Sequence, residues 1–157
     1  MSIPLVLALL IGWPFHPAQL QVKQYRVGRW SIERTLDRLT AGVRCSVKFD
    51  RMRLEGKDLV VDFGRKIDTT DSVYRIDDGL VKLTQNSEAT RRLWQAQEGE
   101  ARLTNPSGGL IAVPLTEIAS ASRLILRIDT AHQPIKLDVS GLPRVMEKMT
   151  VIGCSAP

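Results

Sequence analysis

Apolar and polar residues alternate over most of the chain after residue 18, and this two-residue period constrains the fold more than any other feature. Alternate side chains of a β-strand point to opposite faces of a sheet. The segment RWSIE places Trp30 and Ile32 on one face, and RCSVKFD places Cys45, Val47 and Phe49 on one face. The same period predicts further strands at 52–55, 58–63, 72–77, 80–83, 109–113, 123–129 and 135–141.

The predicted strands are short and are separated by turn residues. Residues 55–58, Glu-Gly-Lys-Asp, are typical of a tight turn, and Asp78-Gly79 is a hairpin signal between the segments 72–77 and 80–83. Short connections of this kind join neighbouring antiparallel strands. The sequence therefore favours an antiparallel arrangement.

Three segments have helical spacing instead. Ser87 is a typical N-cap for a helix over 88–98, a short helix is expected within 114–120, and Pro143 suits the first turn of a helix over 142–149. The predicted fold is mainly β, an antiparallel sandwich or open barrel with two or three short helices.

The first residues form a separate apolar run from Ile3 to Phe15. A membrane-spanning helix needs roughly 20 apolar residues, whereas the apolar part of a secretory signal has about 7–15. We therefore predict a signal peptide over residues 1–18 and a single exported β-rich domain over 19–157. Cleavage after Ala18 places His16 where a small residue is preferred, so an uncleaved short anchor and a strand of the fold stay open as alternatives.

The two cysteines, Cys45 and Cys154, support export. They are far apart in the sequence, and neither has a second Cys or a His at metal-ligand spacing. In an oxidising compartment an even number of cysteines usually pairs. We predict a Cys45–Cys154 disulfide, which by the chain-entropy account stabilises the fold by roughly 4–5 kcal/mol. Two unpaired buried thiols in a cytosolic protein are the alternative.

The net charge of +5 is unevenly distributed. Residues 22–75 hold 13 Lys or Arg against 8 Asp or Glu, whereas residues 76–157 hold 9 of each. Excess positive charge favours anionic partners. On the strand phase given above, Arg44 and Lys48 point away from the core, and the candidate anion-binding residues are Arg44, Lys48, Arg51 and Arg53. Four more arginines precede them and would extend this face in a hairpin: Arg26, Arg29, Arg34 and Arg38.

Other candidate sites have simpler structural explanations. The acidic segment from Asp68 to Asp78 has carboxylates for Ca²⁺ or for acid–base chemistry on a glycan, but its spacing is not that of an EF-hand, and Asp is common in turns. We expect His132 to be a surface-loop residue. The NPSGGL segment, 105–110, lacks the ending of a phosphate-binding loop and is expected to be a turn entering a strand.

Several of these features together resemble a known family. The Trp in RWSIE, the Cys in RCSVKF, the VYRIDDG turn and the terminal helix ending in Gly-Cys are similar to bacterial exported proteins of the invasion-associated locus B type. The resemblance implies a small periplasmic or surface-associated β domain. It supplies no catalytic residues.

The sequence thus predicts a non-enzymatic periplasmic, secreted or envelope-associated domain that binds an anionic envelope component or a protein partner. The alternative is a periplasmic enzyme or enzyme inhibitor with a cleft near the Asp68–Asp78 segment. We expect no cofactor, no metal ion, no nucleic-acid partner and no spanning segment after processing. An enzyme should bury two or more convergent titratable groups in a pocket, whereas a binding domain should present an open charged or apolar face.

Overall fold

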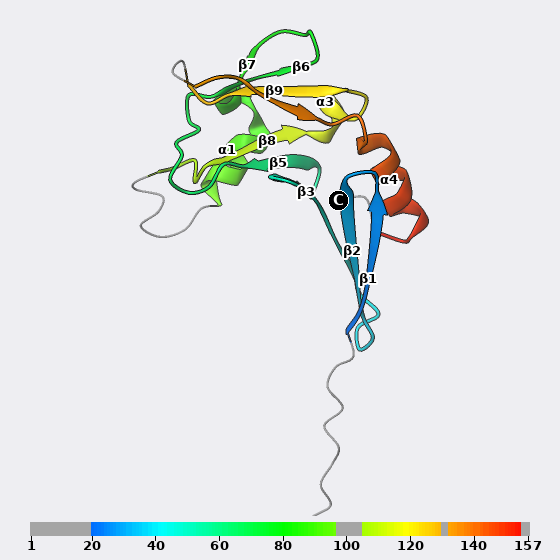
Figure 1. The fold of residues 1–157 in the computed structure, drawn as a ribbon. Helices are drawn as coiled ribbons and strands as arrows, with labels where there is room; N and C mark the ends of the chain where they lie inside the picture. The colour runs from blue at the N-terminus through cyan, green and yellow to red at the C-terminus, as the bar shows by residue number, and fades with distance from the viewer. Residues whose placement is uncertain (1–19, 97–104, 130–131, 155–157) are drawn as a thin grey trace, which may run out of the picture.

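The computed structural model describes residues 20–96, 105–129 and 132–154, and within them the strands form two antiparallel sheets (Figure 1). The first sheet has the order β1-β2-β3-β4-β5-β8, and the second has the order β10-β9-β6-β7. The strands of the first are β1 (Leu20–Val27), β2 (Trp30–Asp37), β3 (Val43–Phe49), β4 (Met52–Glu55), β5 (Asp58–Asp62) and β8 (Leu110–Pro114). Those of the second are β6 (Val73–Ile76), β7 (Lys82–Leu83), β9 (Arg123–Arg127) and β10 (Ile135–Asp138). The prediction of a mainly antiparallel β fold is confirmed, and the described strands do not close into a barrel.

The predicted helices are also present. They are α1 (Glu88–Gln95), α3 (Leu115–Ile118) and α4 (Leu142–Val151), and a 3-10 turn, η1 (Thr84–Asn86), precedes α1. The Ser87 side chain caps α1 by accepting a hydrogen bond from the Thr90 amide, as the sequence predicts. The α4 helix has a proline in its first turn.

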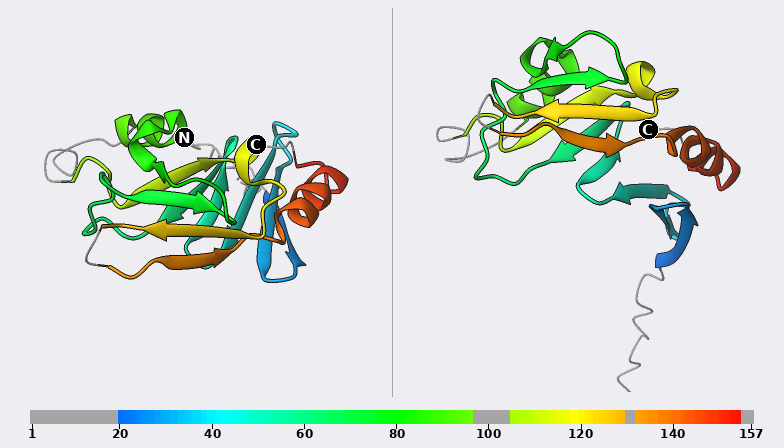
Figure 2. Two further views of the ribbon diagram at one scale, coloured as in Figure 1. Left: turned by 90° about the horizontal axis from the view of Figure 1, so that it is seen from above. Right: turned by 45° about the horizontal axis from the view of Figure 1, so that its top comes forward.

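The core lies between the two sheets, which Figure 2 shows stacked over one another. In the first sheet, residues at matching register positions on β2, β3, β4, β5 and β8 are buried: Ile32, Val47, Leu54, Leu59 and Val113. In the second sheet the buried residues include Tyr74, Leu124, Leu126 and Leu137. The strand period placed Ile32 and Val47 on the inward faces of their strands, and both belong to this core.

The β5 and β8 strands are buried on both faces, because α1 covers the face that points away from the second sheet. Val60, Ala112 and Leu110 form a second small core with Ala89 and Leu93 of the helix. The helix is also tied to the strand by hydrogen bonds: the Thr90 hydroxyl donates to the Ala112 carbonyl at 2.8 Å, and the Trp94 indole nitrogen donates to the Leu110 carbonyl at 2.8 Å.

The β1–β2 hairpin extends from the body of the molecule beside α4 (Figure 1). Its two-residue turn contains Gly28 at a φ of 57°, the left-handed conformation that glycine adopts without strain. On the helix side, the Lys148 ammonium nitrogen lies 5.5 Å from the centre of the Tyr25 ring. The sequence does not predict β1 as a strand.

The Cys45–Cys154 disulfide is present, which confirms the prediction. It links β3 to Cys154, three residues after the last residue of α4. The amide of Cys154 donates to the Met149 carbonyl at 2.9 Å, and the amide of Gly153 donates to the Thr150 carbonyl at 3.1 Å. With Gly153 at a φ of 70°, this is the Schellman pattern of a helix end, and it directs Cys154 back toward the sheet.

The predicted signal peptide, residues 1–18, lies outside the described residues. Among the described helices, none has the length and apolar character needed to cross a membrane.

Candidate functional site

The strand register brings three cations into one row across the first sheet. Arg26 of β1 pairs with Ser31 of β2, Ser31 pairs with Lys48 of β3, and Lys48 pairs with Arg53 of β4. Directly paired residues point to the same face, and their chain neighbours in β2 to β4 are the core residues, so this row points away from the core. We call Arg26, Ser31, Lys48 and Arg53 the cationic row.

A polar hollow with a volume of about 490 Å³ lies over β1 to β3 at this row. Its polar lining side chains are Gln24, Arg26, Ser31, Glu33, Ser46 and Lys48. The hollow therefore combines two cations with hydroxyl and amide hydrogen-bond donors, and among the described residues Glu33 is the one carboxylate that lines it. Such a surface can hold an anion by charge and by hydrogen bonds together.

The cations of the row differ in whether they are already paired. The Arg53 guanidinium forms ion pairs with Glu55 and with Asp62, the second at 3.2 Å. Neither Arg26 nor Lys48 forms an ion pair with a residue that the structure describes. The charges of Arg26 and Lys48 are thus available to a ligand, whereas Arg53 is largely neutralised by its neighbours.

Arg44 lies on the same face as Lys48, four residues earlier in β3, as predicted, and is exposed. Its charge lies close enough to the Asp37 carboxylate to affect the pKa of that group. The pKa of Asp37 is lowered by hydrogen bonds from the Leu39 amide and the Thr40 hydroxyl, with a smaller contribution from the Arg44 charge. Arg44 is a peripheral member of this face rather than part of the hollow.

Arg51 does not join the row. It follows Asp50, whose φ of 53° turns the chain between β3 and β4, and its guanidinium carbon lies 5.4 Å from the centre of the Phe63 ring. It is also 3.9 Å from the Asp50 carboxylate. Arg51 therefore remains a candidate from the sequence, but it lies on the turn beside Phe63 and not in the row.

Of the arginines that precede β3 in the sequence, Arg26 belongs to the cationic row. Arg34 pairs with Cys45 and so lies on the opposite face of the sheet, which corrects the expectation that it extends the cationic face. The Arg29 guanidinium carbon lies 4.5 Å from the centre of the Phe49 ring. The period of β2, which buries Ile32, was the signal that could have excluded Arg34 beforehand.

The aspartates of the acidic segment lie in the turns before and after β6, as predicted, and their carboxylates do not converge. Asp68 accepts hydrogen bonds from the Thr70 hydroxyl at 2.6 Å and the Thr70 amide at 2.9 Å, which lower its pKa. Asp77 accepts from the Arg123 amide at 2.8 Å, and Asp78 forms an ion pair with the Arg123 side chain at 3.5 Å. Within the described ranges no group of three or more His, Cys, Asp or Glu is placed to hold a metal ion.

His132 and the NPSGGL segment also lie as predicted. His132 is exposed, with its Nδ1 2.7 Å from an Asp129 carboxylate oxygen. The NPSGGL segment turns into β8. There Gly109 has a φ of 75°, and a Cβ at that residue would lie 2.1 Å from the Gly64 carbonyl oxygen, so only glycine fits.

A second polar cluster, which the sequence reasoning missed, joins the two sheets. The Tyr74 hydroxyl donates to Glu117 at 3.2 Å, and Lys82 donates to the same carboxylate oxygen at 2.6 Å. These residues line an open hollow of about 610 Å³. Burial, together with the charge of Glu117 and its hydrogen bond, raises the pKa of Tyr74 to about 12. Tyr74 is therefore a neutral donor at ordinary pH, and Lys82 compensates the Glu117 charge.

Comparisons of this chain with protein-family models, with curated proteins and with solved structures found no match.

Proposed function

We propose that this chain is a non-enzymatic binding domain that docks on anionic material of the bacterial envelope through its cationic row. The observation that carries the proposal is the alignment of Arg26 and Lys48, both without an ion-pair partner among the described residues, on either side of Ser31. Two strand spacings separate the two cations, so their backbones are roughly 10 Å apart. This arrangement suits phosphate-rich or otherwise multiply charged surfaces better than a single small anion.

The compartment in the proposal rests on three observations. The disulfide is typical of proteins in oxidising surroundings such as the periplasm or the cell exterior. The apolar run at residues 3–15 has the length of a secretory signal. The resemblance to exported proteins of the invasion-associated locus B type points in the same direction.

The alternative of a periplasmic enzyme or inhibitor has less support. Asp68 accepts a hydrogen bond within its own turn, Asp77 accepts one from the Arg123 amide, and Asp78 forms an ion pair with the Arg123 side chain. The Tyr74–Glu117–Lys82 cluster does converge in a hollow, but its charges compensate each other and Lys82 and Glu117 are partly exposed. A solvated, self-compensated cluster is a weak source of acid–base catalysis.

Binding to vesicles that contain phosphatidylglycerol tests the proposal. The Debye length falls from about 30 Å at 0.01 M salt to about 8 Å at 0.15 M, so we expect binding to weaken steeply over this range. The double variant Arg26→Glu/Lys48→Glu should bind at least about 30-fold more weakly at low salt, since the loss of each cation near an anionic surface removes about 1 kcal/mol and the two new carboxylates add repulsion. Far-ultraviolet circular dichroism would establish that the variant is folded.

Two controls make the test specific. Arg91→Glu/Arg144→Glu changes the net charge by the same amount at exposed positions outside the row and should bind nearly as the wild type does. Glu33→Gln removes the one carboxylate of the hollow and should strengthen binding. Equal losses from both double variants would show that only net charge matters and would refute docking through the row.

A further inference from the structure

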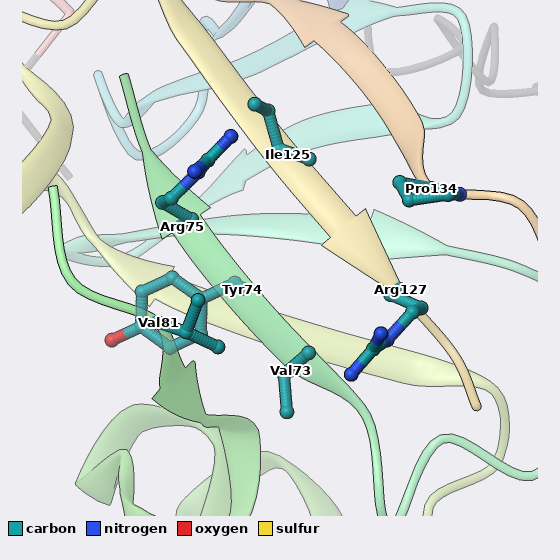
Figure 3. A pocket seen from close by; sticks show the side chains of 7 residues that line it. All are labelled: Val73, Tyr74, Arg75, Val81, Ile125, Arg127 and Pro134. Atoms are coloured by element: carbon teal, nitrogen blue, oxygen red, sulfur yellow. The ribbon is translucent and has the colours of Figure 1, made fainter. Parts of the chain in front are cut away.

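A second surface, on the other side of the molecule's core, has a different chemical character. It is the outer face of the second sheet, where a shallow groove of about 210 Å³ lies over β6 and β9 (Figure 3). Val73, Val81, Ile125 and Pro134 form its apolar lining. Val73 and Ile125 alternate in sequence with the core residues Tyr74, Leu124 and Leu126, so the face they form with Val81 and Pro134 is turned away from the core.

Cations border this apolar groove. Figure 3 shows Arg75 and Arg127, which come from the neighbouring strands β6 and β9, among the lining side chains. Arg75 pairs with Ile125, and Ile125 pairs with Lys136 of β10, which places a third cation on the same face. No carboxylate lines the groove within the described residues, and none of the three cations has an ion pair there.

The apolar surface continues onto β7 and the loop that precedes it. Leu80 is 86% exposed, Val81 is 61% exposed and Leu83 is 42% exposed. Single exposed apolar residues are ordinary, but a contiguous group beside a groove is typical of a protein-interaction surface.

The size and charge of the groove indicate which kind of partner it can bind. Pockets that enclose a small ligand usually have about 300–1,000 Å³, so this smaller groove suits one or two large side chains. Its cationic border favours carboxylates beside those side chains. Residues 1–19 contain no Asp or Glu and so lack the complementary charge, and a second copy of this chain carries the same +5 net charge and is repelled overall.

We propose that the outer face of the second sheet docks a segment of a protein partner in which large apolar side chains are flanked by carboxylates. The apolar side chains enter the groove between Val73, Val81 and Ile125, and the carboxylates pair with Arg75, Arg127 and Lys136. This surface is separate from the cationic row, and its partner is a different class of molecule.

Selection from a display library of random dodecapeptides, with the disulfide-bonded protein as bait, tests the inference. The enriched peptides should combine large apolar residues with Asp or Glu, and they should bind Arg75→Glu/Arg127→Glu at least tenfold more weakly than the wild type. A second variant, Val81→Asp, places a carboxylate in the groove at an exposed position and should also weaken binding. The control Arg65→Glu/Lys66→Glu, with the same change in net charge on an exposed turn, should bind as the wild type does.

Several outcomes would overturn the inference. These are a library without enrichment, enriched peptides that lack carboxylates, or equal losses in the groove and control variants. Two further measurements address other occupants. If Arg75→Glu/Arg127→Glu abolishes vesicle binding while leaving peptide binding unchanged, the face is a lipid-binding surface. If it instead abolishes self-association in light scattering, the occupant is a second copy.

Discussion

Single residues in this fold owe their properties to the opposite sheet as much as to their own strand. Tyr74 belongs to the second sheet, but its hydroxyl group contacts Glu117 of α3, which directly follows β8 of the first sheet. Burial and the Glu117 charge both disfavour the tyrosinate form. The titration of Tyr74 therefore reports whether the two sheets are in contact.

We predict that Tyr74 ionises at a pH of about 12 in the folded protein. Because the pKa is raised on folding, its contribution to stability is complete below the unfolded value near 10 and is lost as the pH rises toward 12. Glu117→Gln should lower the pKa only in part, since burial is the larger cause. Tyrosinate absorbance measured against the Tyr74→Phe variant would assign the transition, and ionisation near pH 10 in the folded state would contradict the prediction.

At the scale of whole elements, local signals in the sequence account for most of the strands and helices of this fold. Strand period and turn residues predicted most strands and all three helices, because each is a local signal in the sequence. They did not predict β1, because Leu20 and Val22 occupy its polar face and blur the alternation. They did not explain the burial of Val60 either, since that depends on α1 packing over β5.

The candidate site, too, could be predicted only in part from the sequence. The outward phase of Arg44 and Lys48 follows from the two-residue period, so the sequence predicted it. The alignment of Arg26 with Lys48 depends on the register across β2, which the turn at Gly28 helps to set and which no local pattern reveals. Arg51 lies on the turn between β3 and β4, and the left-handed conformation at Asp50 there explains why it is not part of the row.

Removing the disulfide with Cys45→Ala/Cys154→Ala should lower the free energy of unfolding by about 4–5 kcal/mol, because the bond closes a loop with a sequence separation of 109 residues. Urea unfolding of the variant and of the wild type would measure the difference. Reduced wild-type protein should lose a similar amount. A loss below about 1 kcal/mol in both would contradict a stabilising role for the bond.

The attachment of α1 can be tested with Thr90→Val. The Thr90 hydroxyl donates to the Ala112 carbonyl and accepts from the Ala112 amide, so the isosteric valine removes the partner of a buried amide and leaves the carbonyl only its longer hydrogen bond from the Ser87 hydroxyl at 3.4 Å. We expect a loss of about 1–3 kcal/mol in the free energy of unfolding, measured with urea. The matched control is Thr150→Val on the exposed side of α4, which should change stability by less than about 0.5 kcal/mol. Equal losses in the free energy of unfolding for the two variants would show that the hydrogen bonds between Thr90 and Ala112 do not stabilise the fold.

At the scale of the whole molecule, the two sheets bury one another's inner faces and leave two outer faces with different chemistry. The outer face of the first sheet, over β1 to β3, is polar and carries the cationic row, with Glu33 as the one carboxylate in its hollow. The outer face of the second sheet is apolar with a cationic border. A domain of this kind has two separate surfaces with which to join an anionic surface and a protein partner.

The most direct test of the central claim is a backbone-amide NMR titration of the disulfide-bonded protein with inorganic polyphosphate at low salt. Docking through the cationic row predicts that the largest shift changes fall on β1 to β3 around Arg26, Ser31 and Lys48, and that they disappear in Arg26→Glu/Lys48→Glu and at 0.15 M salt. Shift changes that are spread evenly over the exposed cations, or that centre on the second sheet, would contradict the claim.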